Sequence, residues 1–356
     1  MMVNNLVKSA LFGLALSLAI PAFAQDSTDS GTEAPEIQPD EVILKNGSRI
    51  LGTVTSARDG TIVVSTDFAG DISIDSAEVE SVRTFGSLVV QMSDGQIIQD
   101  QPIEFDEGSM EITTDSGEQN LYSTTDIALI NPEPWELGFG YKATGNASLA
   151  WGMERGNSDT DELDFKTEAF WRSLEDRYTL KMNYDLDKSN GVKNTDKWRV
   201  IGKYDRFLEG PHYWGINTNF ERDEFADLDL RAYIGPYYGR QFFEKPAFTL
   251  STEVGLSYVI ENFTTAEDQR YLGANWTVNM STDKLGGGSR TYIDHVGVWN
   301  LEETSDLILN TIFGISVPLI YGFQAALEVK LEYDSGAVDG VKELDQTYKL
   351  RLGYAW

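Results

Sequence analysis

The sequence contains no cysteine at any of its 356 positions and only two histidines. The missing thiols exclude disulfide bonds, thiol catalysis, zinc–thiolate sites and a lipoprotein anchor. Basic residues are scarce too, because 28 Lys and Arg oppose 57 Asp and Glu, which leaves a formal net charge of -29. This charge argues against nucleic acid and anionic lipid headgroups as electrostatic partners.

The apolar run at residues 10–20 is too short for a membrane helix, which needs about 20 apolar residues. It follows Lys8 and precedes the small-residue motif formed by Ala22, Phe23 and Ala24. We therefore expect a secretory signal peptide over residues 1–24, cleaved after Ala24. A single membrane helix is the alternative, which the length disfavours. Residues 25–40 lack aromatics and predict a solvated linker. Secretion without disulfides is typical of a bacterial envelope protein.

Two sequence repeats follow this linker. The segment KNGSRI at 45–50 matches SDGQII at 93–98, and glycines and apolar positions recur at the same offset of 48 residues. Short alternating stretches between Asn-Gly, Asp-Gly or Glu-Gly turns predict strands. We expect a β-rich module over 41–131, built as two units in tandem at 41–84 and 87–131. Residues 25–132 hold 21 acidic and 4 basic residues. The acidic module either binds a periplasmic partner or cations, or only presents a solvated surface.

From residue 135 onward, segments of ten to twelve residues alternate apolar with polar side chains, as in FTLSTEVGLSY at 248–258. Period two predicts strands with one apolar face. Strands of a soluble sandwich usually have about five or six residues, whereas about ten are needed to cross a bilayer. Aromatic pairs such as Tyr237–Tyr238 lie near segment ends, as in the girdles of membrane barrels. We predict an all-β fold in which about twelve strands form a transmembrane antiparallel up-and-down barrel over 135–356.

An even number of strands leaves both barrel ends on one side of the membrane. The long polar turns, such as DSGAVDGVKELD at 334–345, are predicted to face outward. We therefore expect an outer-membrane protein of a Gram-negative bacterium, with the N-terminal module and the C-terminus in the periplasm. Expected partners are outer-membrane lipid and, during biogenesis, the barrel-insertion machinery. The last strand ends in alternating apolar residues that resemble the assembly signal of that machinery: Tyr348, Leu350, Leu352, Tyr354 and Trp356.

Charged residues on the polar face of these strands should line the barrel lumen. Eight are basic and nine acidic, which favours a narrow or filled lumen over a selective pore with one sign of charge. Asp294 instead falls on the apolar row with Tyr292, Val296 and Val298, so we expect a bulge or a shifted register there. The predicted lumen charges are Glu154, Asp164, Lys166, Glu168, Lys181, Asp185, Arg199, Lys203, Asp205, Asp229, Arg231, Glu253, Glu328, Lys330, Glu332, Lys349 and Arg351.

Catalytic and metal-binding patterns are weak. A barrel hydrolase would need a serine activated by a neighbouring base. His212 follows Pro211 in a turn, and His295 follows Asp294 on the opposite face of a strand. No calcium-loop spacing and no His-rich tract occurs. We therefore expect no enzyme activity, no cofactor and no defined metal site.

The motifs ERGNSDTDELDFKTEAFWR, RAYIGPYYGRQFF and FTLSTEVGLSYVIE resemble the domain-of-unknown-function family 481, the putative salt-induced outer-membrane proteins. The resemblance covers roughly 135–356. The family's Gly-Asn-Thr-Asp pattern falls on Gly156–Asp159, where Ser158 replaces the threonine. The resemblance implies an outer-membrane location, a preceding periplasmic segment and no transferable site residues.

Together these observations predict an integral barrel with a structural or envelope-adaptation role and an acidic periplasmic module. A narrow diffusion or transport pore for small solutes or ions is the alternative. An outer-membrane hydrolase is the third hypothesis.

Overall fold

The structure is a computed structural model that describes residues 38–356, except 59, 107–108, 114–118, 124–125, 155, 157–158, 246 and 339. The expected signal peptide, its cleavage motif at Ala22 and Ala24, and the linker up to residue 37 lie outside the described residues. The chain divides into two compact units, one up to residue 128 and the other from residue 129 onward. Within the described residues, no helix has the length and apolar character to cross a membrane.

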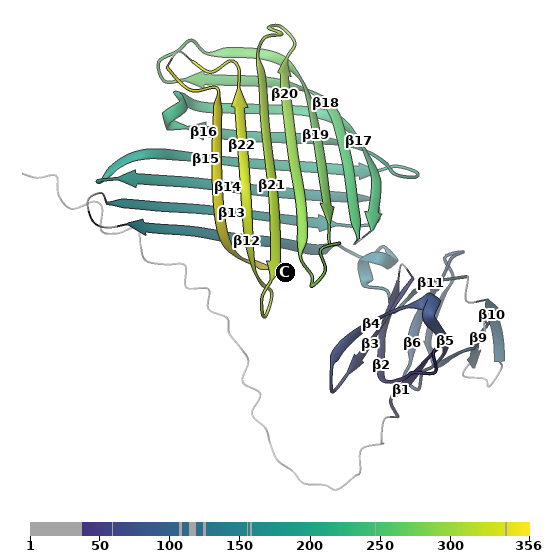
Figure 1. The fold of residues 1–356 in the computed structure, drawn as a ribbon. Coiled ribbons are helices and arrows are strands. Elements are labelled where there is room, and N and C mark those ends of the chain that lie inside the picture. Colours follow the sequence, from purple (N-terminus) through teal and green to yellow (C-terminus); the bar gives the residue numbers. More distant parts are fainter. Residues whose placement is uncertain are drawn as a thin grey trace, which may run out of the picture. The chain divides into compact units, whose positions relative to one another are not determined.

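The first unit is a β-sheet module (Figure 1). Its short apolar stretches form eleven strands, and a 3-10 turn, η1 (Ser76–Glu78), precedes β5. The strands are β1 (Asp40–Leu44), β2 (Arg49–Arg58), β3 (Thr61–Thr66), β4 (Gly70–Asp75), β5 (Val79–Arg83), β6 (Leu88–Met92), β7 (Ile97–Gln101), β8 (Ile103–Asp106), β9 (Ser109–Thr113), β10 (Gln119–Ser123) and β11 (Ile127–Ile130).

The two repeats of the module interlock instead of folding as separate tandem units. The strand order is β10-β9-β8-β5-β1-β2-β11-β6-β7, so β5 of the first repeat pairs with β8 of the second. In the same way, β11 of the second repeat lies between β2 and β6. A repeat on its own would leave these strand edges unpaired. Pairing between the two repeats gives hydrogen-bond partners to both edges. The repeat spacing of 48 residues alone does not indicate this pairing.

The module has its own apolar core, centred on Val42, Val54 and Val64, all nearly inaccessible to solvent. The buried carboxylate of Asp40 accepts hydrogen bonds from the backbone N–H groups of Val54, at 2.8 Å, and Phe85, at 2.9 Å. These bonds hold the ends of the first repeat together, because Asp40 directly precedes the repeat, Val54 lies within it and Phe85 directly follows it.

The second unit is a closed antiparallel barrel of twelve strands, which confirms the predicted fold class. Short 3-10 turns, η3 (Pro134–Leu137) and η4 (Glu224–Ala226), precede β12 and β17. The strands are β12 (Lys142–Glu154), β13 (Thr160–Arg172), β14 (Asp176–Ser189), β15 (Val192–Phe207), β16 (His212–Asp223), β17 (Leu228–Lys245), β18 (Phe248–Phe263), β19 (Gln269–Thr282), β20 (Arg290–Asn300), β21 (Leu307–Pro318), β22 (Phe323–Asp334) and β23 (Leu344–Ala355).

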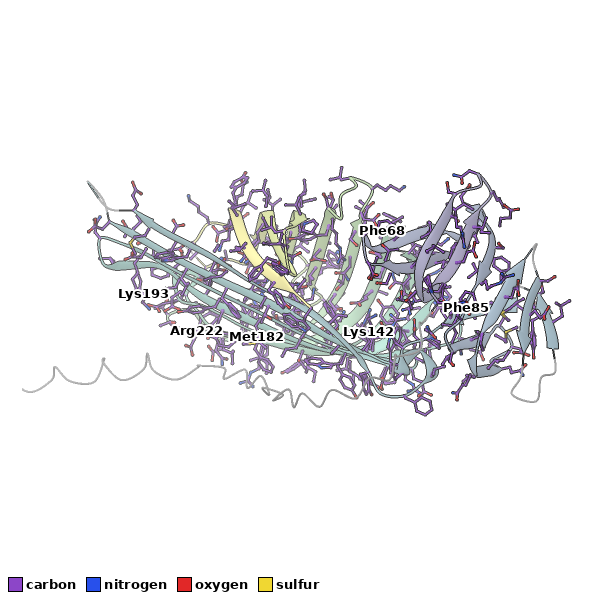
Figure 2. The ribbon with its side chains drawn as sticks, turned by 90° about the horizontal axis from the view of Figure 1, so that it is seen from below. Phe68, Phe85, Lys142, Met182, Lys193 and Arg222 are labelled. Carbon is purple, nitrogen blue, oxygen red and sulfur yellow. The ribbon has the colours of Figure 1, made fainter. Side chains whose placement is uncertain are left out.

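The barrel is apolar outside and polar inside, the arrangement of an outer-membrane barrel. Outward side chains such as Met182 and Trp214 are exposed, whereas lumen residues such as Asp205 and Glu253 are buried. Lys142 marks the end at which the chain enters the barrel, here called the entry end, and Lys193 lies near the opposite, far end (Figure 2).

Inward glycines allow tyrosine rings to lie flat against the wall. Tyr213 on β16 covers Gly239 on β17, and Tyr237 on β17 covers Gly215 on β16, so that a Cβ at either glycine would overlap a ring. The two rings pack edge to face with centroids 6.4 Å apart. These contacts narrow the lumen without adding charge.

The prediction of a bulge or a shifted register at Asp294 is wrong. Strand β20 pairs with β19 and β21 without a register shift, and Asp294 lies opposite the inward residue Asn279. The row with Tyr292, Val296 and Val298 therefore faces the lumen. Exposing a carboxylate to lipid costs more than placing two valines inside the barrel, so the charge decides the orientation of the strand.

Candidate functional site: the barrel lumen

The lumen is the candidate site because most buried charges of the barrel converge there. On the entry side of its middle, Lys203 Nζ lies 2.6 Å from both carboxylate oxygens of Glu253. The hydroxyl of Tyr213 also donates to Glu253 at 3.0 Å. Next to this pair, Arg177 contacts Asp205 at 2.7 Å. Each acid is thus neutralised by a base on another strand.

Nearer the far end, a layer of ion pairs crosses the lumen. Arg199 on β15 contacts Glu221 at 2.8 Å and donates to the side-chain oxygen of Asn310 on β21 at 3.1 Å. Strands β15 and β21 are six positions apart in a ring of twelve, so they are opposite walls. Lys197, also on β15, contacts Glu332 on β22 at 2.8 Å. The opposite walls therefore touch through their side chains.

Arg231 adds a second crossing in the same layer. It contacts Asp334 at 2.7 Å, which links β17 to β22, and it also pairs with Glu261 and Glu221. The acids of this layer, Glu221, Glu261, Glu332 and Asp334, outnumber its main bases, Lys197, Arg199 and Arg231, although Lys330 also contacts Glu332 at 3.0 Å. Removal of the bases would leave a negative constriction.

A third group of ion pairs lies where the first and last strands meet. Lys166 on β13 contacts Glu328 on β22 at 2.8 Å, and Glu328 also accepts from Arg351 on β23 at 2.5 Å. Arg351 and Lys349 both pair with Asp164 on β13, and Lys349 reaches Asp185 on β14. The contacts that involve β13 or β14 pass in front of β12, whose inward Ala150 and Gly152 are small enough to leave room.

A cavity of about 520 Å³ extends from the entry end into the middle of the lumen, where the pairs Lys203–Glu253 and Lys166–Glu328 form part of its lining. Its lining combines neutral amides and hydroxyls, such as Asn217 and Thr277, with aromatic residues and charges that mostly pair with one another. The amide oxygen of Asn217 is buried without a hydrogen-bond partner among protein atoms. A smaller space of about 70 Å³ lies at the far-end layer. The described lumen is thus a polar chamber followed by a charged closure.

The structure places all nine candidate lumen charges inside the barrel: Arg199, Lys203, Arg231, Glu253, Glu328, Lys330, Glu332, Lys349 and Arg351. Two residues of the wider predicted row differ. Glu154 is exposed at the far end of β12. Asp229 lies at the register shift between Leu228 and Leu230 of β17, and it is exposed outside the lumen, 3.7 Å from Arg222.

Sequence reasoning missed Arg177, Lys197, Glu221, Glu261 and Asp334 as lumen charges. Each of them lies on the polar row of its strand, so extending the alternation to the strand ends would have found them.

The two histidines lie on the outer surface of the barrel. His295 Nε2 accepts from Trp276 Nε1 at 3.0 Å, so the ring proton lies on Nδ1, which is 2.8 Å from Thr311 Oγ1. His295 therefore donates to the hydroxyl and does not act as its base. His212 Nδ1 lies 2.7 Å from the Tyr238 hydroxyl. Hydrolase chemistry stays a hypothesis that these contacts do not favour.

The residues that the structure describes contain no group of three or more His, Asp or Glu side chains arranged to hold a metal ion. Outside the strands, the loop between β20 and β21 buries Asp306, which accepts from the side chain of Asn300 at 3.0 Å. Burial raises the pKa of Asp306 above its ordinary value.

Residues 147–356 match the family described as "Protein of unknown function, DUF481". No curated protein sequence matches the chain at a significant level. Among solved structures, the chain is similar to the translocator domain of the autotransporter NalP from Neisseria meningitidis, with 11% identity, a TM-score of 0.36, and coverage of 61% of this chain and 88% of that one.

Two further structures are similar in fold type only. For the β domain of the Bordetella autotransporter BrkA, the identity is 10% and the TM-score 0.31, over 61% of this chain and 98% of that one. For the outer membrane channel DcaP of Acinetobacter baumannii, these values are 10% and 0.31, over 90% of this chain and 94% of that one.

Proposed function

Because the chain belongs to the family described as "Protein of unknown function, DUF481", as its motifs predicted, we propose a role that rests on its barrel. The protein is an integral outer-membrane barrel whose lumen is closed by its own side chains. It serves the envelope as a structural or adaptive component and not as an open diffusion pore. Its acidic N-terminal module is presented to the periplasm, where it binds a partner or attracts cations.

The observation that carries this proposal is the contact between opposite walls of the lumen. Arg199 joins β15 to β21, and Lys197 and Arg231 join β15 and β17 to β22. An ion-selective pore concentrates one sign of charge along an open path. Here the two signs neutralise each other across the lumen, which supports a filled interior.

The outward surface supports insertion into a bilayer. Its strands carry apolar side chains, such as Val254 and Leu256, that are exposed on the outside of the barrel. A barrel can expose such a surface to lipid wherever neighbouring strands pair their backbone groups within the wall. The outer membrane is the expected location, with both barrel ends on the periplasmic side.

The test is single-channel conductance of the refolded chain without residues 1–24 in planar bilayers. The unmodified protein should give no discrete steps. The variant Lys197→Ala/Arg199→Ala/Arg231→Ala should give steps that favour cations, because Glu221, Glu261, Glu332 and Asp334 then lack most of their bases. The variant Arg206→Ala/Arg222→Ala/Arg240→Ala is the control, because it removes the same charge from outward positions.

A small-solute pore is the second candidate, favoured by the polar chamber of about 520 Å³ at the entry end. Steady conductance steps from the unmodified protein would support this candidate and refute the closed lumen. Silence of both the unmodified protein and the triple lumen variant, with a folded barrel, would show that other residues close the path.

A further inference from the structure

The contact between the first and last barrel strands, here called the closing seam, is paired over only part of its length. Strands β12 and β23 pair from Asn146–Leu149 against Leu352–Ala355, and Gly145 and Trp356 exchange two backbone hydrogen bonds of 3.0 Å beyond that. Neighbouring strands elsewhere in the barrel pair over ten or more positions. Figure 1 shows β12 and β23 meeting near the C-terminus and diverging from there.

Past the last pair, Leu149 and Leu352, both strands continue without a ladder between them. The same register would join residues 150–153 of β12 to residues 348–351 of β23. These two segments are called the open seam. Backbone N–H and C=O groups left unpaired in hydrocarbon cost several kcal/mol each, so the open seam needs polar partners that lipid tails cannot offer.

The outward side chains of the open seam are unusually exposed, which agrees with the missing ladder. Trp151, Tyr348 and Leu350 are 67%, 70% and 72% exposed. Outward residues in fully paired parts of the wall are less exposed, for example Trp214 at 43%, Leu256 at 55% and Val254 at 61%. A side chain on a paired strand is flanked on both sides, whereas these three lack a neighbour on one side.

Ion pairs span the open seam inside the barrel, but they do not replace the missing ladder. Lys349 pairs with Asp185 on β14, three strand positions away from β23. Three positions correspond to about 14 Å along the wall, since neighbouring strands lie about 4.8 Å apart. Arg351 spans β12 in the same way through Asp164, so these side chains bridge the lumen side of the seam and leave the backbone groups of the open seam unpaired.

The directions of the two edges define what can fill the open seam. Strands β12 and β23 run antiparallel to each other, so a single inserted strand would be antiparallel to one edge and parallel to the other. Two strands of opposite direction satisfy both edges. A second copy of this chain offers such a pair, because its β23 matches β12 and its β12 matches β23 in the register that the closing seam already uses.

We propose that the open seam is a dimerisation surface, in which β12 of each protomer pairs with β23 of the other. The arrangement has two-fold symmetry about an axis along the membrane normal, and the same patch is used on both protomers. It converts eight residues with unpaired edges per protomer into two continuous ladders. The inference does not depend on whether the lumen conducts.

Disulfide cross-linking tests this proposal on a cysteine-free background. Trp151 and Leu350 would lie directly opposite each other, and both point outward, so the lumen charges stay unchanged. Opposed positions on antiparallel strands bring Cα atoms to about 4.5–5.5 Å, which a disulfide bridges. Full-length chains with Trp151→Cys and chains of different tag length with Leu350→Cys are coexpressed and oxidised in native membranes.

The proposal expects a shift of the mixed chains from monomer to dimer mass. Pairing of Ile216→Cys with Leu350→Cys gives the background from collisions, because Ile216 lies on β16, and its dimer band should be much weaker. The double variant Ala147→Cys/Tyr354→Cys, at paired positions, should cross-link within one chain and shows that oxidation works.

Two results would overturn the proposal. An intrachain cross-link in the double variant Trp151→Cys/Leu350→Cys, without a mixed dimer, would mean that the seam closes on itself. Absence of both products, while the control at positions 147 and 354 cross-links, would mean that the open seam has no strand partner.

Discussion

The pair of Lys203 and Glu253 offers the sharpest test of whether the lumen is filled or wet. Only 13% of the Lys203 side chain and 3% of the Glu253 side chain are exposed. Removal of one partner of a buried ion pair costs about 3–5 kcal/mol, because the other charge stays buried without compensation. A pair of the same geometry in a water-filled channel would contribute about 0–1 kcal/mol.

We therefore expect Lys203→Met to lower the free energy of unfolding by about 3 kcal/mol, at the low end of that range because the Tyr213 hydroxyl still donates to Glu253. The double variant Lys203→Met/Glu253→Leu should recover most of this loss, because replacing both charges by apolar groups is often neutral. Urea unfolding of the vesicle-embedded barrel, followed by tryptophan fluorescence, measures both changes.

Lys193 provides a matched control. It contacts Asp196 at 2.7 Å, but its side chain is 38% exposed, so Lys193→Met should cost less than about 1 kcal/mol. If Lys203→Met costs no more than Lys193→Met, the lumen around Glu253 is hydrated. Such a result would refute the proposal that side chains fill the lumen at this pair.

Three further predictions follow from the fold. Gly239→Val should destabilise the barrel by about 1–3 kcal/mol, measured by urea unfolding, because its side chain would overlap the ring of Tyr213. Burial raises the pKa of Asp306, so its contribution favours folding at low pH and is lost as the pH rises through the folded-state pKa; Asp306→Asn should therefore raise stability at neutral pH and change little in acid. Deletion of Trp356 removes both of its backbone hydrogen bonds to Gly145, and loss of the heat-modifiable folded band on gels is the expected result.

The barrel strands and their two faces could be predicted from the sequence because both depend on local alternation. A residue two positions along a strand returns to the same face, so the inward direction of Arg199 and Glu332 follows from their neighbours in sequence. The prediction failed where alternation and charge conflicted, at Asp294, and where a register shift interrupted it, at Asp229. At Asp294, the cost of exposing a charge to lipid outweighs the benefit of exposing the apolar residues on the same face of the strand.

Which charges meet inside the barrel could not be predicted in the same way. Arg199 and Asn310 are separated by 111 residues, and Lys197 and Glu332 by 135. Their contacts depend on how far the strands are staggered when the barrel closes, a property of all twelve strands together. The same holds for the closing seam: the sequences of β12 and β23 fit one register, but only Asn146–Leu149 and Leu352–Ala355 form a ladder in it. How far the last strand pairs with the first depends on the closure of the whole barrel, which the alternation along either strand does not encode.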